Sequence, residues 1–153
     1  MTLKEQLATE IKDAMKSKAA NKAEKLATLR GLKSTLQNEE IKLQQDNLTA
    51  EQELIVVSRE VKQTKEELEG FKKATGDYTE TILKLKNRIE ELTRFLPKQL
   101  SAAEVEQVIQ EVIISVGATG KADMGKVMGA VMPKLKGKAD GKLINQTVAK
   151  LLN

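Results

Sequence analysis

The sequence predicts an all-α protein in two parts, an N-terminal helical hairpin domain followed by a small C-terminal three-helix domain. Aromatic residues make up 2% of the 153 residues and apolar residues 40%, so the core must consist of aliphatic side chains, which suit helix-on-helix packing. Apolar residues recur at spacings of three and four along most of the chain, which is the period of an α-helix. Capping residues and helix breakers then divide the chain into its elements.

Residues 1–48 predict two helices. Thr2 and Glu5 have the spacing of a capping box, which begins a first helix that we expect to end near residues 17–21. A second helix follows and gives way to a polar segment at residues 44–47. The expected inward positions are Leu3, Leu7, Ile11 and Met15 in the first helix, and Leu26, Leu29, Leu32, Leu36 and Leu43 in the second.

Two apolar seams follow. Thr49 and Gln52 form the next capping box, Gly76 is the expected stop of that helix, and Asp77 with Glu80 begins another. Alternating spacings of three and four are typical of helices that lie along a partner, so we expect a helical hairpin, while exposed parts of the seams leave a homo-oligomer open. The seams consist of Leu54, Val57, Val61, Thr64, Leu68 and Phe71, and of Tyr78, Ile82, Leu85, Ile89, Leu92 and Leu96.

The chain changes character at Pro97, which disfavours continuation of the preceding helix. A third capping box, Ser101 with Glu104, begins the next helix. We therefore expect two domains, 1–96 and 97–153, with the boundary close to Pro97.

Three short helices are expected in the second domain. Gly117 ends the first, Asp123 caps the second, Pro133 ends or kinks the second, and Asp140 caps the third. The inward positions are expected to be Val105, Val108, Ile109, Val112, Ile113 and Val116, then Met124, Val127, Met128 and Val131, then Leu143, Ile144, Val148, Leu151 and Leu152.

Charge is distributed unevenly along the chain. Residues 1–96 contain 18 Lys/Arg and 17 Asp/Glu, whereas residues 97–153 contain 8 and 5. From Gly117 onward the lysines are opposed only by Asp123 and Asp140. Such a segment attracts phosphate backbones, although a lysine-rich surface equally serves solubility, and composition alone favours the second interpretation. The candidate RNA contacts are Lys126, Lys134, Lys136, Lys138 and Lys142.

The turn into the last helix is the clearest landmark. Gly137 and Gly141 lie on either side of Lys138, next to a helix start whose unpaired N–H groups attract phosphate. As an N-cap, Asp140 would occupy one of these donors and repel an anion, so phosphate is expected on Lys138 and Lys142 instead. Because aromatic side chains are so few, we expect recognition of a folded RNA rather than stacking on unpaired bases.

Two glycine patterns favour structural interpretations. Residues 120–127 match the first seven positions of a phosphate-binding P-loop, but Val127 replaces the required Ser/Thr and no strand is expected before Gly120, so a helix start is favoured. Gly125 and Gly129 lie one helical turn apart. We interpret them as sites of close helix packing ahead of close approach to a ribose–phosphate strand, and the two roles are compatible.

The composition argues against catalysis. The chain contains no cysteine and no histidine, so it lacks the thiolate and the imidazole base that glutamine hydrolysis usually requires. Adjacent glutamates at 39–40, 66–67 and 90–91 point apart on a helix and are expected to be solvated. We assign no catalytic residue, metal or cofactor. No apolar stretch of membrane length and no leader is expected, which indicates a cytoplasmic protein with no membrane partner.

Three separated motifs carry a resemblance to a known family. They are Phe-Leu-Pro-Lys-Gln-Leu-Ser at residues 95–101, Asp-Met-Gly-Lys-Val-Met at 123–128 and Gly-Lys-Ala-Asp-Gly at 137–141. In this order they resemble the GatB/YqeY family, which includes stand-alone two-domain helical proteins and the C-terminal tail of the B subunit of glutamine-dependent aspartyl/glutamyl-tRNA amidotransferase. The resemblance covers the whole chain. It implies an all-helical fold and, since that tail grips tRNA, an RNA-contacting role for residues 97–153.

Three functions are therefore considered. The first is a non-catalytic accessory protein for tRNA or another folded RNA, with an amidotransferase or another tRNA-synthesis component as a further partner. The second is a scaffold whose N-terminal hairpin grips a protein while the lysines only provide solubility. The third and weakest is the carbon–nitrogen ligase with glutamine as amide donor that the family resemblance suggests.

Overall fold

The computed structural model describes residues 1–152, and this part of the chain contains seven α-helices, one short 3-10 turn and no strand. The all-α prediction is thereby confirmed. The chain divides into two compact units, residues 1–96 and residues 97–153, which we call the N-terminal and C-terminal units and describe separately. No helix within residues 1–152 combines the length and the apolar character needed to cross a bilayer.

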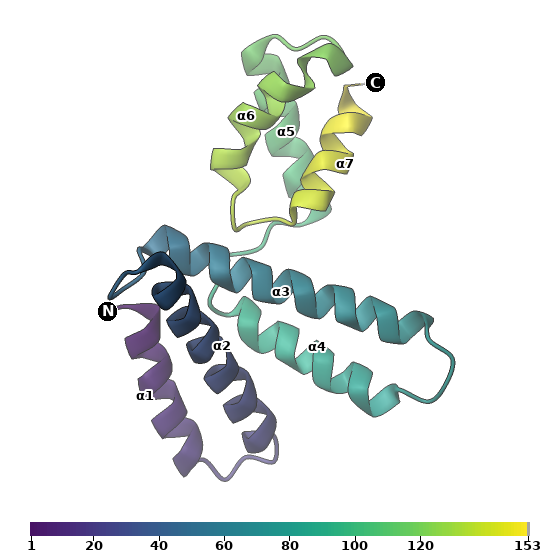
Figure 1. Ribbon diagram of the computed structural model, residues 1–153. Coiled ribbons are helices and arrows are strands. Elements are labelled where there is room, and N and C mark those ends of the chain that lie inside the picture. Colours follow the sequence, from purple (N-terminus) through teal and green to yellow (C-terminus); the bar gives the residue numbers. More distant parts are fainter. Residues whose placement is uncertain (153) are drawn as a thin grey trace. The chain divides into compact units, whose positions relative to one another are not determined.

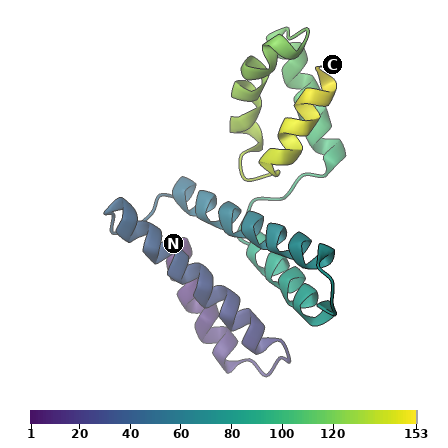
Figure 2. The ribbon, with the colours of Figure 1, turned by 45° about the vertical axis from the view of Figure 1, so that its right-hand side comes forward.

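The N-terminal unit consists of four helices: α1 (Leu3–Lys16), α2 (Lys22–Leu43), α3 (Ala50–Lys73) and α4 (Thr79–Thr93). Helix α1 packs against α2 and α3 packs against α4, and Figures 1 and 2 show each pair antiparallel and joined by a loop. Helix α2 also contacts α3 and α4, which brings the two pairs together. The shared core contains Leu7, Ala14, Leu29, Leu32, Leu36, Leu48, Val56, Val57, Val61 and Leu92.

The C-terminal unit consists of α5 (Ala102–Val116), the 3-10 turn η1 (Lys121–Asp123), α6 (Met124–Leu135) and α7 (Gly141–Leu151). Each α-helix contacts the other two, and Figure 1 shows the loop between α6 and α7 at the same end of the unit as the start of α5. A separate aliphatic core holds these helices together. It contains Val105, Ile109, Val112, Val127, Val131, Leu135, Ile144, Val148 and Leu152.

The three predicted capping boxes are all present. In each, the threonine or serine oxygen accepts from the third helical N–H while the Glu or Gln side chain accepts from the cap N–H, at α1, α3 and α5. Gly117 ends α5 in a left-handed conformation with φ 68°, and its N–H donates to the carbonyls of Ile113 and Ile114. A side chain is strained at such a φ, which explains why glycine stands at this helix end.

Two predicted caps differ from the expected side-chain capping. The Asp77 carboxylate accepts from the hydroxyl of Thr79 at 2.7 Å and from its N–H at 3.1 Å, and the cap position of α4 belongs to Tyr78. Asp123 is the N-cap residue of α6, as predicted, but its carboxylate accepts from the N–H of Thr119 at 3.0 Å and makes no cap bond to the helix. In both cases a nearer donor in the preceding or following turn competes for the short side chain.

Some expected boundaries and inward positions also differ. Helix α3 ends at Lys73 with Ala74 as its cap, so Gly76 lies in the loop, where the rings of Phe71 and Tyr78 are 5.1 Å apart. Met15 and Leu43, at the last turns of α1 and α2, are 51% and 40% exposed instead of inward, since a helix end has fewer neighbours than its middle. Pro133 does not end α6, which continues to Leu135.

Candidate nucleic-acid interface

The loop between α6 and α7, residues 136–140, is held by main-chain hydrogen bonds. The N–H of Lys138 donates to the carbonyl of Leu135 at 2.9 Å, and the carbonyl of Lys138 accepts from the N–H of Leu100 at 2.9 Å. Gly137 has φ 75°, a conformation that glycine adopts without strain. The backbone of Lys138 is therefore fixed on both sides, and its side chain extends from a well-defined position.

A side chain from outside this loop adds to the restraint. The Nε2 of Gln99 donates to the carbonyl of Gly137 at 2.7 Å and to the carbonyl of Pro97 at 2.9 Å. The segment before α5 and the segment before α7 are 38 residues apart in the sequence, and these bonds join them. The sequence motifs at residues 95–101 and 137–141 are therefore in direct contact in the structure.

Asp140 lies at the N-cap of α7, where its carboxylate accepts from the N–H of Lys142 at 3.1 Å. Gly141 is the first residue of that helix and is exposed. The carboxylate thus occupies one of the donors that an anion would need at this helix start. Neighbouring ammonium groups, rather than the helix end itself, are the groups available to a phosphate.

The candidate lysines are all exposed, but they do not form one cluster. Lys134 lies in the last turn of α6, Lys136 and Lys138 in the following loop, and Lys142 in the first turn of α7, so these four lie at one end of the unit. Lys126 lies in the first turn of α6, and a rise of 1.5 Å per residue places its Cα about 12 Å along the helix from that of Lys134.

Most of these ammonium groups have no counterion among residues 1–152. No salt bridge with residues 1–152 is formed by four of them, Lys126, Lys134, Lys138 and Lys142. Lys136, by contrast, does interact with another group. We call Lys134, Lys136, Lys138 and Lys142 the loop-end lysines. They concentrate positive charge at the end of the unit that Gln99 braces.

Sequence reasoning missed the segment before α5 as part of this end. Lys98 is exposed and precedes Gln99, whose side chain reaches the loop, so Lys98 belongs to the same end of the unit as the loop-end lysines. The signal was present, because the Pro-Lys-Gln-Leu motif and the Gly-Lys-Ala-Asp-Gly motif were both recognised. What the sequence did not show was that they are in contact.

The glycines of α6 do not pack against another helix. A Cβ atom placed on Gly125 or Gly129 would meet no atom within 4 Å, and both residues are exposed. The buried positions of this helix are Val127, Val131 and Leu135. The interpretation of close helix packing was therefore wrong.

Opposite charge lies on another helix of the same unit. Glu104, Glu106 and Glu111 all belong to α5, which contains no lysine or arginine. Three of the five acidic residues of the unit thus lie on α5, whereas six of its eight lysines lie on α6, α7 and the loop between them, where Asp140 is the one acidic residue.

In the N-terminal unit, seven of the 18 basic residues form salt bridges with glutamates of the same unit. Arg59 lies 3.0 Å from Glu39, and its hydrogen bond is the main cause that lowers the pKa of that glutamate. Arg94 contacts both Glu10 and Glu91. Burial by itself lowers the pKa of Arg94, but the two carboxylates raise it overall.

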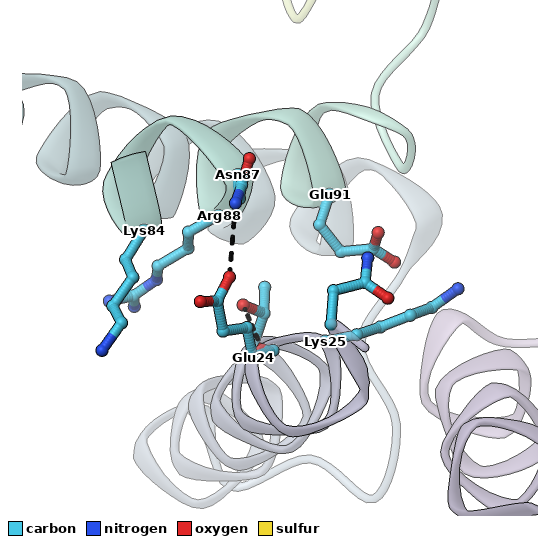
Figure 3. Close-up of a pocket in the computed structure, with 8 residues that line it drawn as sticks. Glu24, Lys25, Lys84, Asn87, Arg88 and Glu91 are labelled. Atoms are coloured by element: carbon cyan, nitrogen blue, oxygen red, sulfur yellow. Dashed lines mark hydrogen bonds between the residues drawn. The ribbon is translucent and has the colours of Figure 1, made fainter. Parts of the chain in front are cut away.

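Figure 3 shows a small cleft between α2 and α4 in this unit. It has a volume of about 40 Å³ and adjoins a wider cleft of about 480 Å³, with which it shares Asn21, Lys25 and Glu91. Glu24 points from α2 to Asn87 of α4 and accepts from its amide at 3.3 Å. The lining is a mixture of charges of both signs, and no group of three or more potential metal ligands occurs within residues 1–152.

Similarity to known proteins extends over both units. The sequence profile of a family described as "Yqey-like protein" matches residues 4–152. The E subunit of glutamyl-tRNA(Gln) amidotransferase from Thermococcus sibiricus is 49% identical over 55 residues, which are 33% of this chain and 9% of that relative. The corresponding protein of Methanocaldococcus jannaschii is 36% identical over 91 residues, 57% of this chain and 13% of that relative.

A further relative with the same name, from Methanococcus maripaludis strain C6, is 44% identical over 57 residues, 35% of this chain and 9% of that relative. The matched part of the chain therefore spans about a tenth of the length of these curated relatives. The family profile, by contrast, matches nearly all of the chain. This protein belongs to the Yqey-like protein family.

Proposed function

We propose that this chain is a non-catalytic accessory protein that associates with tRNA or another folded RNA through its C-terminal unit. The observation that carries the proposal is the group of loop-end lysines, which are exposed on or next to a braced loop and, Lys136 apart, form no salt bridge to residues 1–152. Lysines that are not neutralised within a protein are available to release counterions from a phosphate backbone.

The polarity of the unit supports an oriented approach to a polyanion. The glutamates of α5 repel phosphate while the lysines of α6, α7 and their loop attract it. The absence of any Phe, Tyr or Trp from residues 97–153 leaves no platform on which unpaired bases could stack. Phosphates of a folded RNA are therefore the chemistry that this surface fits best.

The relatives support tRNA as the kind of RNA. Their name states that they are subunits of a glutamyl-tRNA(Gln) amidotransferase. The stretches of 55 and 57 matched residues have about the length of the C-terminal unit, residues 97–153. We further propose that an amidotransferase or another component of tRNA synthesis is a protein partner, and that the chain acts in the cytoplasm.

The test is the affinity for a fluorescein-labelled tRNA(Gln) transcript, measured by anisotropy at several salt concentrations. Lys138→Glu with Lys142→Glu should weaken binding by about tenfold or more and reduce the salt slope by about two, because two phosphate contacts are lost. Lys62→Glu with Lys65→Glu is the matched control, since both lysines are exposed on α3 and form no salt bridge within residues 1–152. Failure of the unchanged chain to bind the transcript at low salt would end the proposal.

Two alternative functions, a protein-binding scaffold and a ligase, can be tested with the same purified chain and its lysine variants. Ile41 and Leu83, 75% and 58% exposed in the N-terminal unit, favour a protein-binding scaffold. That function predicts a partner retained through residues 1–96 and unaffected by the lysine substitutions, and sedimentation of the chain alone would reveal self-association instead. The ligase function predicts amidation by the purified chain with charged tRNA, glutamine and ATP, and we expect none.

A further inference from the structure

Gln99 joins two motifs of the C-terminal unit through its side-chain amide. Its Nε2 donates to the carbonyl of Gly137 at 2.7 Å and to that of Pro97 at 2.9 Å. The N–H of the next residue, Leu100, donates to the carbonyl of Lys138 at 2.9 Å. Consecutive carbonyls in the loop therefore accept from consecutive residues of the segment before α5.

We propose that Gln99 is a positioning residue that holds Lys138 in place for a phosphate of the bound RNA. This inference rests on the proposed function and deepens it, because it names a residue that determines the affinity of the lysine surface without carrying charge. Gln99 carries no charge, and its side-chain amide donates to one carbonyl in the loop of Lys138 and to one in its own segment, so the proposed role is exerted through the loop.

The physical reason is the entropy of the loop. A lysine on a mobile loop must lose backbone freedom when it binds, whereas a lysine on a restrained loop has already lost it on folding. Residues 136–140 follow a helix end, and Gly137, directly before Lys138, has a conformational freedom that other residues lack. Restraint of Gly137 from outside the loop therefore has more effect than it would on a stiffer residue.

The expected effect is modest and measurable. Gln99→Leu keeps the approximate size of the side chain and removes both donated hydrogen bonds. Because these bonds are exposed, their loss should weaken tRNA binding by about two- to fivefold. Gln107→Leu is the matched control, since Gln107 is exposed on α5 and its side chain makes no hydrogen bond within residues 1–152.

A double-mutant cycle separates positioning from general stability. If Gln99 acts through Lys138, the loss in Gln99→Leu with Lys138→Gln should be no larger than the greater single loss. In Gln99→Leu with Lys126→Gln, the loss of affinity should be the product of the two single losses. The reason is distance, because the Cα of Lys126 lies about 12 Å along α6 from that of Lys134, where the loop end begins. The salt slope of Gln99→Leu should also fall toward that of Lys138→Gln, which a uniform loss of stability would not produce.

Hydrogen exchange provides a readout that does not depend on RNA. The amide of Leu100 should exchange faster in Gln99→Leu, and the amide of Val105 in the first turn of α5 should not. Multiplicative losses with Lys138→Gln, or an unchanged Leu100 amide, would overturn the positioning role while leaving RNA binding intact. If the unchanged chain binds no tRNA transcript, the proposed function and this role fail together.

Discussion

The two units of this protein differ in how their charges are paired. Apart from the contacts of Glu51 and Lys136, the salt bridges within residues 1–152 all belong to the N-terminal unit, where the numbers of basic and acidic residues are nearly equal. The C-terminal unit instead has three of its five acidic residues on α5 and six of its eight lysines on α6, α7 and their loop. Salt bridges therefore hold part of the charge of the N-terminal unit, and the lysines of the C-terminal unit are the ones we propose for RNA.

The choice between arginine and lysine follows the same division. All four arginines lie in residues 1–96, and Arg59, Arg88 and Arg94 form salt bridges between side chains. Residues 97–153 contain only lysine. The planar guanidinium suits a fixed pair, whereas the flexible ammonium suits loose contact with a phosphate backbone. The difference teaches that residue type and pairing, more than net charge, distinguish a structural charge from a binding one.

The largest expected difference is in stability, between a variant that removes one lysine of the N-terminal unit and a variant that removes one lysine of the C-terminal unit. The Nζ of Lys4 lies 2.8 Å from the carboxylate of Glu40, a residue that is only 9% exposed. Lys4→Met leaves this buried carboxylate without its partner, so it should lower the free energy of unfolding by about 1–3 kcal/mol. Lys126→Met removes an exposed lysine without a salt bridge and should change stability by less than about 0.5 kcal/mol. Urea unfolding followed by circular dichroism measures both. Equal losses would show that the lysines of the two units are equivalent.

A smaller effect is expected from the exposed helical glycines. Gly129→Ala in α6 and Gly31→Ala in α2 each add a methyl group that meets no atom within 4 Å, so each should stabilise its helix by about 0.5–1 kcal/mol. If RNA approaches the backbone of α6, Gly129→Ala should also weaken tRNA binding, while Gly31→Ala should not. Thermal unfolding and anisotropy together decide this, and weaker binding in both variants would assign the effect to something other than the α6 surface.

The smallest effect concerns one carboxylate in the N-terminal unit. The hydrogen bond from Arg59 lowers the pKa of Glu39, so this group contributes stability above its ordinary pKa that is lost as the pH falls through the lowered value. Arg59→Gln should raise the pKa of Glu39 toward its ordinary range in a carboxyl NMR titration. Arg30→Gln, at an exposed arginine without a salt bridge within residues 1–152, is the control and should leave Glu39 unchanged.

Local signals in the sequence were sufficient for most helix starts. Each capping box uses two residues three apart, and the geometry of one helical turn then determines the contact, as it does for Thr2 with Glu5. The cap of α4 is Tyr78 instead of Asp77, and the carboxylate of Asp123 makes no bond to the helix that it caps, because a carboxylate near a turn has several donors within reach and sequence alone does not rank them.

The arrangement of the candidate site was less accessible. Lys138 and Asp140 were recognised from their motif, but the hydrogen bond from Gln99 to Gly137 depends on how α5, α6 and α7 pack. The exposure of Gly125 and Gly129 depends on it too, since their helical spacing fits a packed face and an open face equally well. Tertiary packing supplies the information that the pattern of residues lacks.

The pairing of Phe71 with Tyr78 across the α3–α4 loop affects how unfolding can be observed. Tyr78 is the single tyrosine of a chain without tryptophan, so intrinsic ultraviolet fluorescence reports on that loop alone. The C-terminal unit, which contains no aromatic residue, is optically silent in the near ultraviolet. A melting curve recorded through tyrosine therefore follows one unit and misses the other, and a tryptophan placed in α7 would make both visible.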